Sequence, residues 1–383
     1  MNTLTSHIIK FFCCFLVSFL GYVSVAQNIR IPEIPRAGHI GEFLKEDTLT
    51  IRIFGDLMMH SQQISAAATK EGSYNFDEYF THIQKFLNNS DLNIANLEFT
   101  LAGKPFTGYP AFSAPDEYAM HISKCGFNVF LTANNHICDK ASYGMSRTLD
   151  IYRKLKQEHD IQFTGTASNQ EEYQQTTPLI IECKGVKIAI INATYGTNLK
   201  GEKAWPKTNY LNDRKALLQA LQVAEEQADI TLVIPHWGEE YKLRHNSIQK
   251  ATAQWLVENG ADVIIGSHPH VIQDAETISF DEKEVQVAYS LGNAISNMSA
   301  QNTQAELMAT LKIVRHINNT LTILPLEFTY LWSSRPGGYS KSYTILPIKE
   351  FLERRQEWLG EWEYEKMKAT YQRVAEITGI KEN

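Results

Sequence analysis

Short apolar segments that favour β-strands alternate with helical segments from Leu49 onward. The predicted strands lie at residues 50–55, 93–97, 129–133, 186–193, 231–235, 263–266 and 285–291. The predicted helices lie between them at residues 77–87, 143–158, 213–227 and 247–258. Such alternation is typical of an α/β domain whose sheet is buried and largely parallel.

The amino terminus has a different composition from the rest of the chain. An apolar run from Phe11 to Ala26 follows Lys10 and closes with the small-residue pattern Ser24-Val25-Ala26. This pattern is typical of a cleaved secretory signal peptide, so we expect residues 1–26 to be removed on export to the cell envelope, the periplasm or the extracellular space. The alternative is an uncleaved membrane anchor, although the run is short for a spanning helix.

Three further regions follow the signal peptide. Residues 27–48 contain Pro32, Pro35 and Gly38 with little periodicity, which predicts an extended lead-in. We expect the main domain at residues 49–330, and it includes two late antiparallel strands at 306–314 and 320–328. Residues 331–383 are charged and helical in pattern, and they predict a C-terminal helical extension with Trp358, Trp362 and Tyr371 on one docking face.

The net charge argues against broad nucleic-acid binding, and the number and spacing of the cysteines argue against a disulfide framework or a cysteine metal cage. The 383 residues carry a net charge of −7, from 36 basic and 43 acidic side chains, and removal of Lys10 with the signal peptide leaves 35 minus 43, or −8. Without Lys/Arg clusters, we expect no broad nucleic-acid binding, because attraction to phosphates needs a positive patch. The cysteines that remain, Cys125, Cys138 and Cys183, are odd in number and lack C-x-x-C spacing, which argues against a disulfide framework or a cysteine metal cage.

Five of the predicted strands end in residues that can bind a metal ion. These residues are Asp56, Glu98, Asn135 with His136, His236, and His268 with His270. In an open α/β sheet the carboxyl ends of the strands share one edge, so residues far apart in sequence can converge there. Carboxylate, amide and imidazole ligands of this kind can hold two metal ions that activate water for in-line attack.

Each of these residues alone has an ordinary explanation. Asp56 or Glu98 could cap a helix or lie in a solvated turn, and His236 could be a hydrogen-bonded core histidine. The joint order of the residues favours the metal site. His268 and His270 add to it, because alternate residues of an extended strand face the same way and Pro269 restrains the backbone to that shape. We therefore expect both imidazoles to reach one metal cluster.

The polar blocks, in this order, resemble those of the CapA family, the capsule-biosynthesis branch of the calcineurin-like metallophosphoesterases. The matching blocks are Gly55-Asp56, Asn96-Leu97-Glu98, Ala133-Asn134-Asn135-His136 with Asp139, His236-Trp237-Gly238-Glu239-Glu240-Tyr241, Gly266-Ser267-His268-Pro269-His270-Val271 and Tyr289-Ser290-Leu291-Gly292-Asn293. The similarity covers about residues 49–297. It implies a two-sheet sandwich flanked by helices, in an α/β/β/α arrangement, with a dinuclear metal site.

The resemblance also implies a role for each block. The first metal would be bound by Asp56 and His270, the second by Asn135, His236 and His268, and Glu98 would bridge them. His136 would be the general acid or the positive group beside the scissile ester. Asp139 would orient His136 or, preferably, cap a helix. The residues that would support the ligands or contact substrate are Glu239, Glu240, Tyr241 and Asn293; for the first three, a solvated loop is an equally good explanation.

The sequence departs from the wider phosphoesterase pattern at Met58, which occupies the position of a histidine, and His60 lies two residues farther on. We therefore expect the first metal to be held weakly. The ligand types suit manganese, iron or zinc without distinguishing them.

The predicted function is an exported metal-dependent hydrolase that acts on a phosphoester or a related anionic bond. By family it would be linked to poly-γ-glutamate or capsule polysaccharide biosynthesis, with capsule or cell-envelope biosynthesis proteins as partners. The alternative is a non-catalytic envelope protein that binds or exports an anionic polymer.

Overall fold

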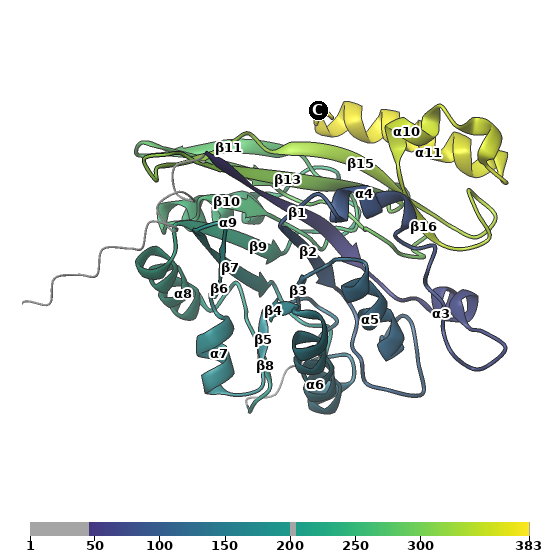
Figure 1. The fold of residues 1–383 in the computed structure, drawn as a ribbon, viewed down its shortest axis with the longest axis horizontal. Coiled ribbons are helices and arrows are strands. Elements are labelled where there is room, and N and C mark those ends of the chain that lie inside the picture. The colour runs from purple at the N-terminus through teal and green to yellow at the C-terminus, as the bar shows by residue number, and fades with distance from the viewer. Residues whose placement is uncertain (1–45, 200–203, 383) are drawn as a thin grey trace, which may run out of the picture. The chain divides into compact units, whose positions relative to one another are not determined.

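The computed structural model describes residues 46–199 and 204–382 (Figure 1). Every helix and strand given below lies in one compact unit that begins at Asp47. The predicted signal peptide at 1–26 and nearly all of the predicted lead-in at 27–48 lie outside the described residues. None of the helices in the described ranges combines the length and the apolar character that crossing a membrane requires.

The larger sheet of the described chain has eight strands in the order β16-β15-β13-β1-β2-β3-β4, with β14 paired to β13. Their bounds are β1 Asp47–Leu57, β2 Leu92–Leu97, β3 Val129–Leu131, β4 Gln162–Thr164, β13 Ala305–Arg315, β14 Leu321–Ile323, β15 Glu327–Ser334 and β16 Thr344–Pro347. Strands β1 to β4 are parallel, whereas β13, β15 and β16 extend the sheet antiparallel.

The second sheet has six strands in the order β11-β12-β10-β9-β7-β6. Their bounds are β6 Leu179–Cys183, β7 Val186–Thr194, β9 Ile230–His236, β10 Val263–Ile265, β11 Ala275–Phe280 and β12 Lys283–Ala288. The four inner strands are parallel and the two edge strands are antiparallel. A two-stranded sheet pairs β5 (Thr166–Ala167) with β8 (Lys207–Thr208).

Helices cover the outer face of each sheet (Figure 1), whereas the C-terminal helices α10 (Ile348–Leu352) and α11 (Glu361–Thr378) belong to the apolar cluster that also contains the inner faces of the sheets. Their bounds are α3 Ser61–Ala67, η2 Thr81–Ile83, α4 Gln84–Leu87, α5 Asp116–Lys124, α6 Ala141–His159, α7 Gln170–Thr176, α8 Arg214–Gln227, α9 Ser247–Glu258, α10 Ile348–Leu352, η3 Arg355–Glu357 and α11 Glu361–Thr378. Helices α5 and α6 share an apolar cluster with the larger sheet, and α8 and α9 share one with the smaller sheet. The C-terminal helix α11 packs near β13 and β15.

Alternating side chains on the inner strands build the core between the two sheets. Ile51 and Ile53 of β1 belong to the same buried cluster as Ile188 and Ile190 of β7. Phe54, the next residue of β1, belongs to the cluster that contains helices α5 and α6. Because successive side chains of a strand point to opposite faces, β1 is buried on both sides, as in a sheet covered by layers above and below.

The predicted α/β sandwich of two sheets flanked by helices is confirmed. Two predicted elements are wrong in detail. The strand expected at 320–328 divides into β14 and β15 at Pro325, which has no N–H for a ladder hydrogen bond. The helix expected at 77–87 is limited to η2 and α4, because the carbonyls of Glu78 and Tyr79 accept hydrogen bonds from Thr344 and Ile345 of β16.

The aromatic face predicted for the C-terminal extension is confirmed only in part: Trp358 and Tyr371 pack against the same buried cluster, with the ring of Tyr371 4.9 Å from that of Tyr330, whereas Trp362 does not. Trp358 precedes α11 and is buried in the inter-sheet cluster, whereas Trp362 is 59% exposed. Residues 331–383 also contribute the strand β16 to the larger sheet. The extension is therefore packed into the sandwich through a strand as well as through helices.

Candidate metal centre

The carboxyl ends of strands from both sheets meet at one buried cluster of polar side chains. Asp56 lies near the end of β1 and Glu98 directly follows β2, both in the larger sheet. His236 is the last residue of β9, and His268 and His270 follow β10, both in the smaller sheet. All five side chains are buried. The convergence predicted at the edge of one sheet thus takes place between two sheets.

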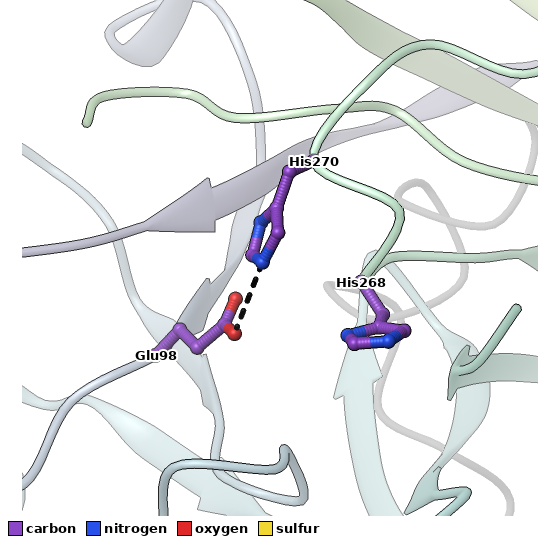
Figure 2. A group of neighbouring side chains, drawn as sticks. All are labelled: Glu98, His268 and His270. Carbon is purple, nitrogen blue, oxygen red and sulfur yellow. Dashed lines mark ion pairs between the residues drawn. The ribbon is translucent and has the colours of Figure 1, made fainter. Parts of the chain in front are cut away.

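Glu98 is the centre of this cluster. It is fully buried, and neither of its carboxylate oxygens has a hydrogen-bond partner among the described residues. Its Oε1 lies 3.8 Å from Nε2 of His236 and 3.8 Å from Nε2 of His270, and Figure 2 shows Glu98 and His270 pointing toward each other. Burial, followed by the nearby carboxylate of Asp56, raises the pKa of Glu98 well above its usual range.

Two groups of three residues have the spacing of metal ligands. The groups are Glu98 with His268 and His270, and Asp56 with Glu98 and His236; one ligand atom per residue lies within 4.8 Å of the others in each group. Glu98 belongs to both groups, which suits the bridging role that the resemblance implies. The ring of His268 lies 4.8 Å from that of His236 and 5.7 Å from that of His270, so it borders the ligands that the resemblance assigned to both metals.

Asn135 contacts the cluster through His236. Its Oδ1 lies 2.6 Å from Nε2 of His236, so the two side chains are close enough to share one ion. Nδ1 of the same imidazole lies 3.0 Å from Oγ of Ser267. Ser267 thereby holds the ring of His236 at Nδ1, which leaves Nε2, on the side of Asn135, as the nitrogen that an ion would bind.

The backbone at His268 and His270 is not the extended strand that the sequence predicted. Both residues have positive φ angles, 100° and 57°, and they lie in the loop after β10. Non-glycine residues rarely adopt this region, and such strain is concentrated at functional sites. The turn nevertheless brings both imidazoles to Glu98 (Figure 2). Nδ1 of His268 is buried and has no hydrogen-bond partner among the described residues.

A close backbone crossing positions Asp56. A Cβ at Gly55 would lie 1.9 Å from the carbonyl oxygen of Gly292, so no larger residue fits there. The carboxylate of Asp56 accepts a hydrogen bond from Asn96 at 2.7 Å and one from the backbone N–H of His268 at 3.2 Å. Both oxygens of Asp56 are therefore already engaged by the protein.

The imidazoles differ in their electrostatic surroundings. Burial, followed by the neighbouring imidazoles, lowers the pKa of His236 and of His268 well below the usual range. Burial also acts to lower the pKa of His270, but its hydrogen bond with Asp56 and the charge of that carboxylate outweigh burial and raise it. Neutral imidazole is the form that binds metals, and His236 and His268 are held in it.

His136 lies beside the cluster and is oriented by Asp139. Its Nδ1 is 2.7 Å from Oδ2 of Asp139, and the same oxygen accepts a hydrogen bond from the backbone N–H of Phe112 at 2.7 Å. The residue before helix α6 is Lys140, which has no side-chain cap. The structure therefore favours the orienting contact of Asp139 over the helix-capping role.

The remaining predicted residues lie at the margin of the cluster. Asn293 places Oδ1 2.9 Å from Nδ1 of His270 and so supports this ring. Tyr241 is 43% exposed with its ring 6.4 Å from that of His270, and burial, with a hydrogen bond to Glu240, raises the pKa of Tyr241 to about 12. Glu239 is exposed and pairs with Lys242, which matches a solvated loop residue.

Several residues of the site were missed by sequence reasoning. Asn198 places Nδ2 3.3 Å from Nε2 of His136, and Tyr195 lies with its ring 4.5 Å from that of His268. Both follow β7, a predicted strand, so the search for polar residues after strand ends could have included them. His60 lies outside both metal-ligand groups found among the described residues, and its Nδ1 faces Gln63 and the N–H of Asn297.

A pocket of about 1010 Å³ opens beside the cluster. His136 and His270 line it together with Tyr241 and Glu240. Met58 and His60 also line the pocket. Met58 stands where the phosphoesterase pattern has a histidine, so the pocket has a thioether at this position in place of an imidazole. The pocket is large enough for a ligand well beyond a single phosphoryl group.

Comparison with known proteins gives a family match over the region that contains this site. Residues 50–298 match the family described as bacterial capsule synthesis protein PGA_cap. The capsule biosynthesis protein CapA of Bacillus anthracis is 28% identical over 297 residues, which cover 74% of this chain and 68% of that protein. The PGA biosynthesis protein CapA of Bacillus subtilis is 25% identical over 297 residues, which cover 74% of this chain and 72% of that protein.

Similarity to solved structures is weaker. The NAD nucleotidase of Haemophilus influenzae has a TM-score of 0.45 and 13% sequence identity, and the match covers 85% of this chain and 62% of that chain. This chain thus spans less than two thirds of the nucleotidase. The fold described above rests on the strands and helices of this chain itself.

Proposed function

This chain belongs to the bacterial capsule synthesis protein PGA_cap family, and from that premise we propose that it is a metal-dependent hydrolase of the metallophosphoesterase type. Its substrate would be a phosphoester or a related anionic bond in capsule or poly-γ-glutamate biosynthesis. We further propose that it is exported, acts at the cell envelope, and works with other capsule or envelope biosynthesis proteins.

The observation that carries this proposal is the environment of Glu98. Burying an ionised carboxylate without a partner is costly, so such groups are normally paired, hydrogen-bonded or bound to a metal. Glu98 has no hydrogen-bond partner among the described residues, yet three imidazoles and Asp56 surround it. Carboxylate and imidazole ligands around a shared carboxylate fit one or two divalent ions, with manganese, iron and zinc all suited to the donor set.

Asp56, Glu98, Asn135, His236, His268 and His270 would hold the ions. When bound, the ions would supply a nucleophile from water at neutral pH and would stabilise negative charge on the reacting oxygens. Asn293 and Ser267 hold the rings of His270 and His236 in place for this purpose.

His136 would act on the leaving oxygen. Asp139 accepts the proton on Nδ1, and Nε2 is then the nitrogen that faces the ligand through the pocket. As an imidazolium, with a proton on each nitrogen, the ring can donate the proton of Nε2 to the leaving oxygen or stabilise its charge. The side chain of Asn198, 3.3 Å from Nε2, can hold a ligand oxygen beside it.

The second candidate function is a non-catalytic envelope protein that binds or exports an anionic polymer. Met58 favours it, because a buried thioether replaces a histidine where the first metal would be bound. Asp56, which would bind the same ion, already has both oxygens in hydrogen bonds with the protein.

A substrate screen separates the two functions. The purified mature protein is loaded in turn with manganese, iron or zinc and assayed with phosphomonoesters and phosphodiesters. Hydrolysis that requires added metal and disappears with a chelator supports the hydrolase. Binding of an anionic polymer without turnover of any ester under the same conditions supports the binding protein.

A further inference from the structure

Arg335 brings a positive charge into the pocket beside the metal centre. It directly follows β15 and lies outside residues 50–298, the part of the chain that matches the family. Arg335 is the one residue among the lysines and arginines of the described chain that lines this pocket. The acidic residues that line it are Asp139 and Glu240. The carboxylate of Asp139 is already engaged by His136 and by the N–H of Phe112.

The guanidinium of Arg335 has unused hydrogen-bonding capacity. Within the described chain, its side chain donates through Nη2 to the carbonyl of Met298, and its Nε is buried without a partner. The carboxylate of Glu363 accepts instead from the backbone N–H of Arg335 at 3.0 Å, from Gln304 at 2.9 Å and from Ser334 at 3.1 Å. A partly buried guanidinium normally has a carboxylate or another anion as its partner.

A short chain of contacts connects Arg335 with the metal centre. Arg335 holds the carbonyl of Met298, whose sulfur lies 3.5 Å from Nδ2 of Asn293. Oδ1 of Asn293 lies 2.9 Å from Nδ1 of His270. Because the pocket of about 1010 Å³ is lined by His270 and Arg335 alike, one extended ligand can contact both.

We propose that Arg335 binds a second anionic group of the ligand, a carboxylate or a phosphate, while another anionic group of that ligand lies at the metal centre. This inference rests on the proposed function, since it takes the pocket as the place where the ligand binds. It narrows the ligand to a class with at least two separated anionic groups. A planar guanidinium suits both candidate groups, because it can donate two parallel hydrogen bonds to either.

The test is a calorimetric titration of the metal-loaded, full mature protein with phosphonates, which are not hydrolysed. Alkylphosphonates of increasing chain length are compared with counterparts that end in a carboxylate or in a second phosphonate. We expect the doubly anionic probes to bind about tenfold more tightly at the length that spans both groups, as a charged hydrogen-bonded pair would provide. The preferred terminal group then distinguishes carboxylate from phosphate.

Three variants assign the effect to Arg335. Arg335→Gln should lose the advantage of the second anionic group and keep the affinity for simple alkylphosphonates, whereas Arg335→Lys should retain part of it. Arg373→Gln is the matched control, because Arg373 is also in the C-terminal segment but pairs with Asn302 and does not line the pocket. Unfolding temperatures of all variants show whether each one is folded.

The inference is overturned if the doubly anionic probes have no advantage at any length, or if Arg335→Gln keeps the full advantage. If Arg335→Lys still binds doubly anionic probes more tightly than simple ones and Arg335→Gln does not, the inference is supported, even where both variants are less stable than the wild type. The titration measures binding and not turnover, so a failure of the hydrolase proposal can be told apart from a failure of the inference about Arg335. A protein that prefers doubly anionic probes but hydrolyses no ester retains this inference and loses the catalytic one.

Discussion

Nδ1 of His136 lies 2.7 Å from Oδ2 of Asp139, and both side chains are almost completely buried. The backbone N–H of Phe112 donates to the same carboxylate oxygen at 2.7 Å, and the ring of Phe112 packs edge-on against the imidazole at 4.6 Å. The imidazole is therefore fixed in its plane, with Nδ1 engaged by Asp139 and Nε2 beside the side-chain amide of Asn198, 3.3 Å away.

The first prediction concerns His136 itself. His136→Ala should keep its metal content and should lose turnover by about 10²–10⁴-fold, the usual contribution of general acid–base catalysis. Its unfolding temperature should fall, because the substitution empties a buried position and removes the imidazole partner of Asp139. His136→Gln retains hydrogen bonding without an ionisable ring, and we expect it to be almost as slow. The measurements are kcat and elemental analysis. Turnover equal to that of the wild type in both variants, at unchanged metal content, would contradict the catalytic role.

The second prediction concerns Asp139. Asp139→Asn keeps the size of the side chain but removes the charge that holds the Nδ1 proton of His136, so kcat should fall by about 10- to 100-fold with little change in KM. In the double variant with His136→Ala, Asp139→Asn should cause almost no further loss, because its effect acts through the imidazole. Independent, additive losses would show that Asp139 acts on something other than His136.

The convergence of the ligands could be predicted from the pattern of strands, whereas the order of layers followed from the family resemblance. The apolar strands are buried on both faces, so their pattern is strong, and the polar residue that ends each strand marks the edge where a site forms. The structure brings the predicted ligands together, as this pattern indicated, although they come from two sheets rather than one: they are Asp56, Glu98, Asn135, His236, His268 and His270.

Other features depend on contacts that a single segment does not reveal. The positive φ angles of His268 and His270 arise in a loop that has to reach Glu98 across the sandwich, whereas Pro269 alone suggested an extended strand. The segment before η2 is not helical because its carbonyls accept hydrogen bonds from β16, 266 residues away in sequence. Arg335 reaches the pocket from beyond the family region, and its sequence neighbourhood carries no motif that indicates this.

The third prediction compares two of the proposed ligands. His236 contacts Asn135 and faces Glu98, whereas Asp56 is already engaged by Asn96 and the backbone of His268, and Met58 offers its site no imidazole. His236→Ala should therefore reduce total bound metal more than Asp56→Ala does. Elemental analysis of both purified variants provides the comparison. Full metal content in both would rule out this assignment.

The fourth prediction concerns Glu306, a second buried carboxyl group, which contacts the backbone of Gly55 next to the proposed ligand Asp56. Glu306 is fully buried, accepts one hydrogen bond from the N–H of Gly55 at 2.7 Å, and has no described partner for its Oε2. Burial raises the pKa of Glu306 well above its usual range. The folded state therefore holds this proton more tightly than the unfolded state, so stability falls as the pH rises from the unfolded pKa toward the folded pKa.

Glu306→Gln removes this pH-dependent cost. We expect the metal-free variant to be more stable than the wild type near pH 7, with the difference shrinking as the pH falls toward about 4, the ordinary pKa of a glutamate. Urea unfolding at a series of pH values measures it. A variant that is less stable at neutral pH, or a difference that does not change with pH, would refute the interpretation.

The central claim is that the buried carboxylate of Glu98 exists to bind metal, and elemental analysis of the mature wild-type protein beside Glu98→Gln tests it most directly. Glutamine preserves the size of the side chain but removes the charge of the shared ligand. The account predicts that the wild type carries a divalent metal, or takes up manganese, iron or zinc, and that Glu98→Gln loses most of it while its metal-free form unfolds at the same or a higher temperature. A wild-type protein that binds none of these ions, or a Glu98→Gln variant with full metal content, would contradict it.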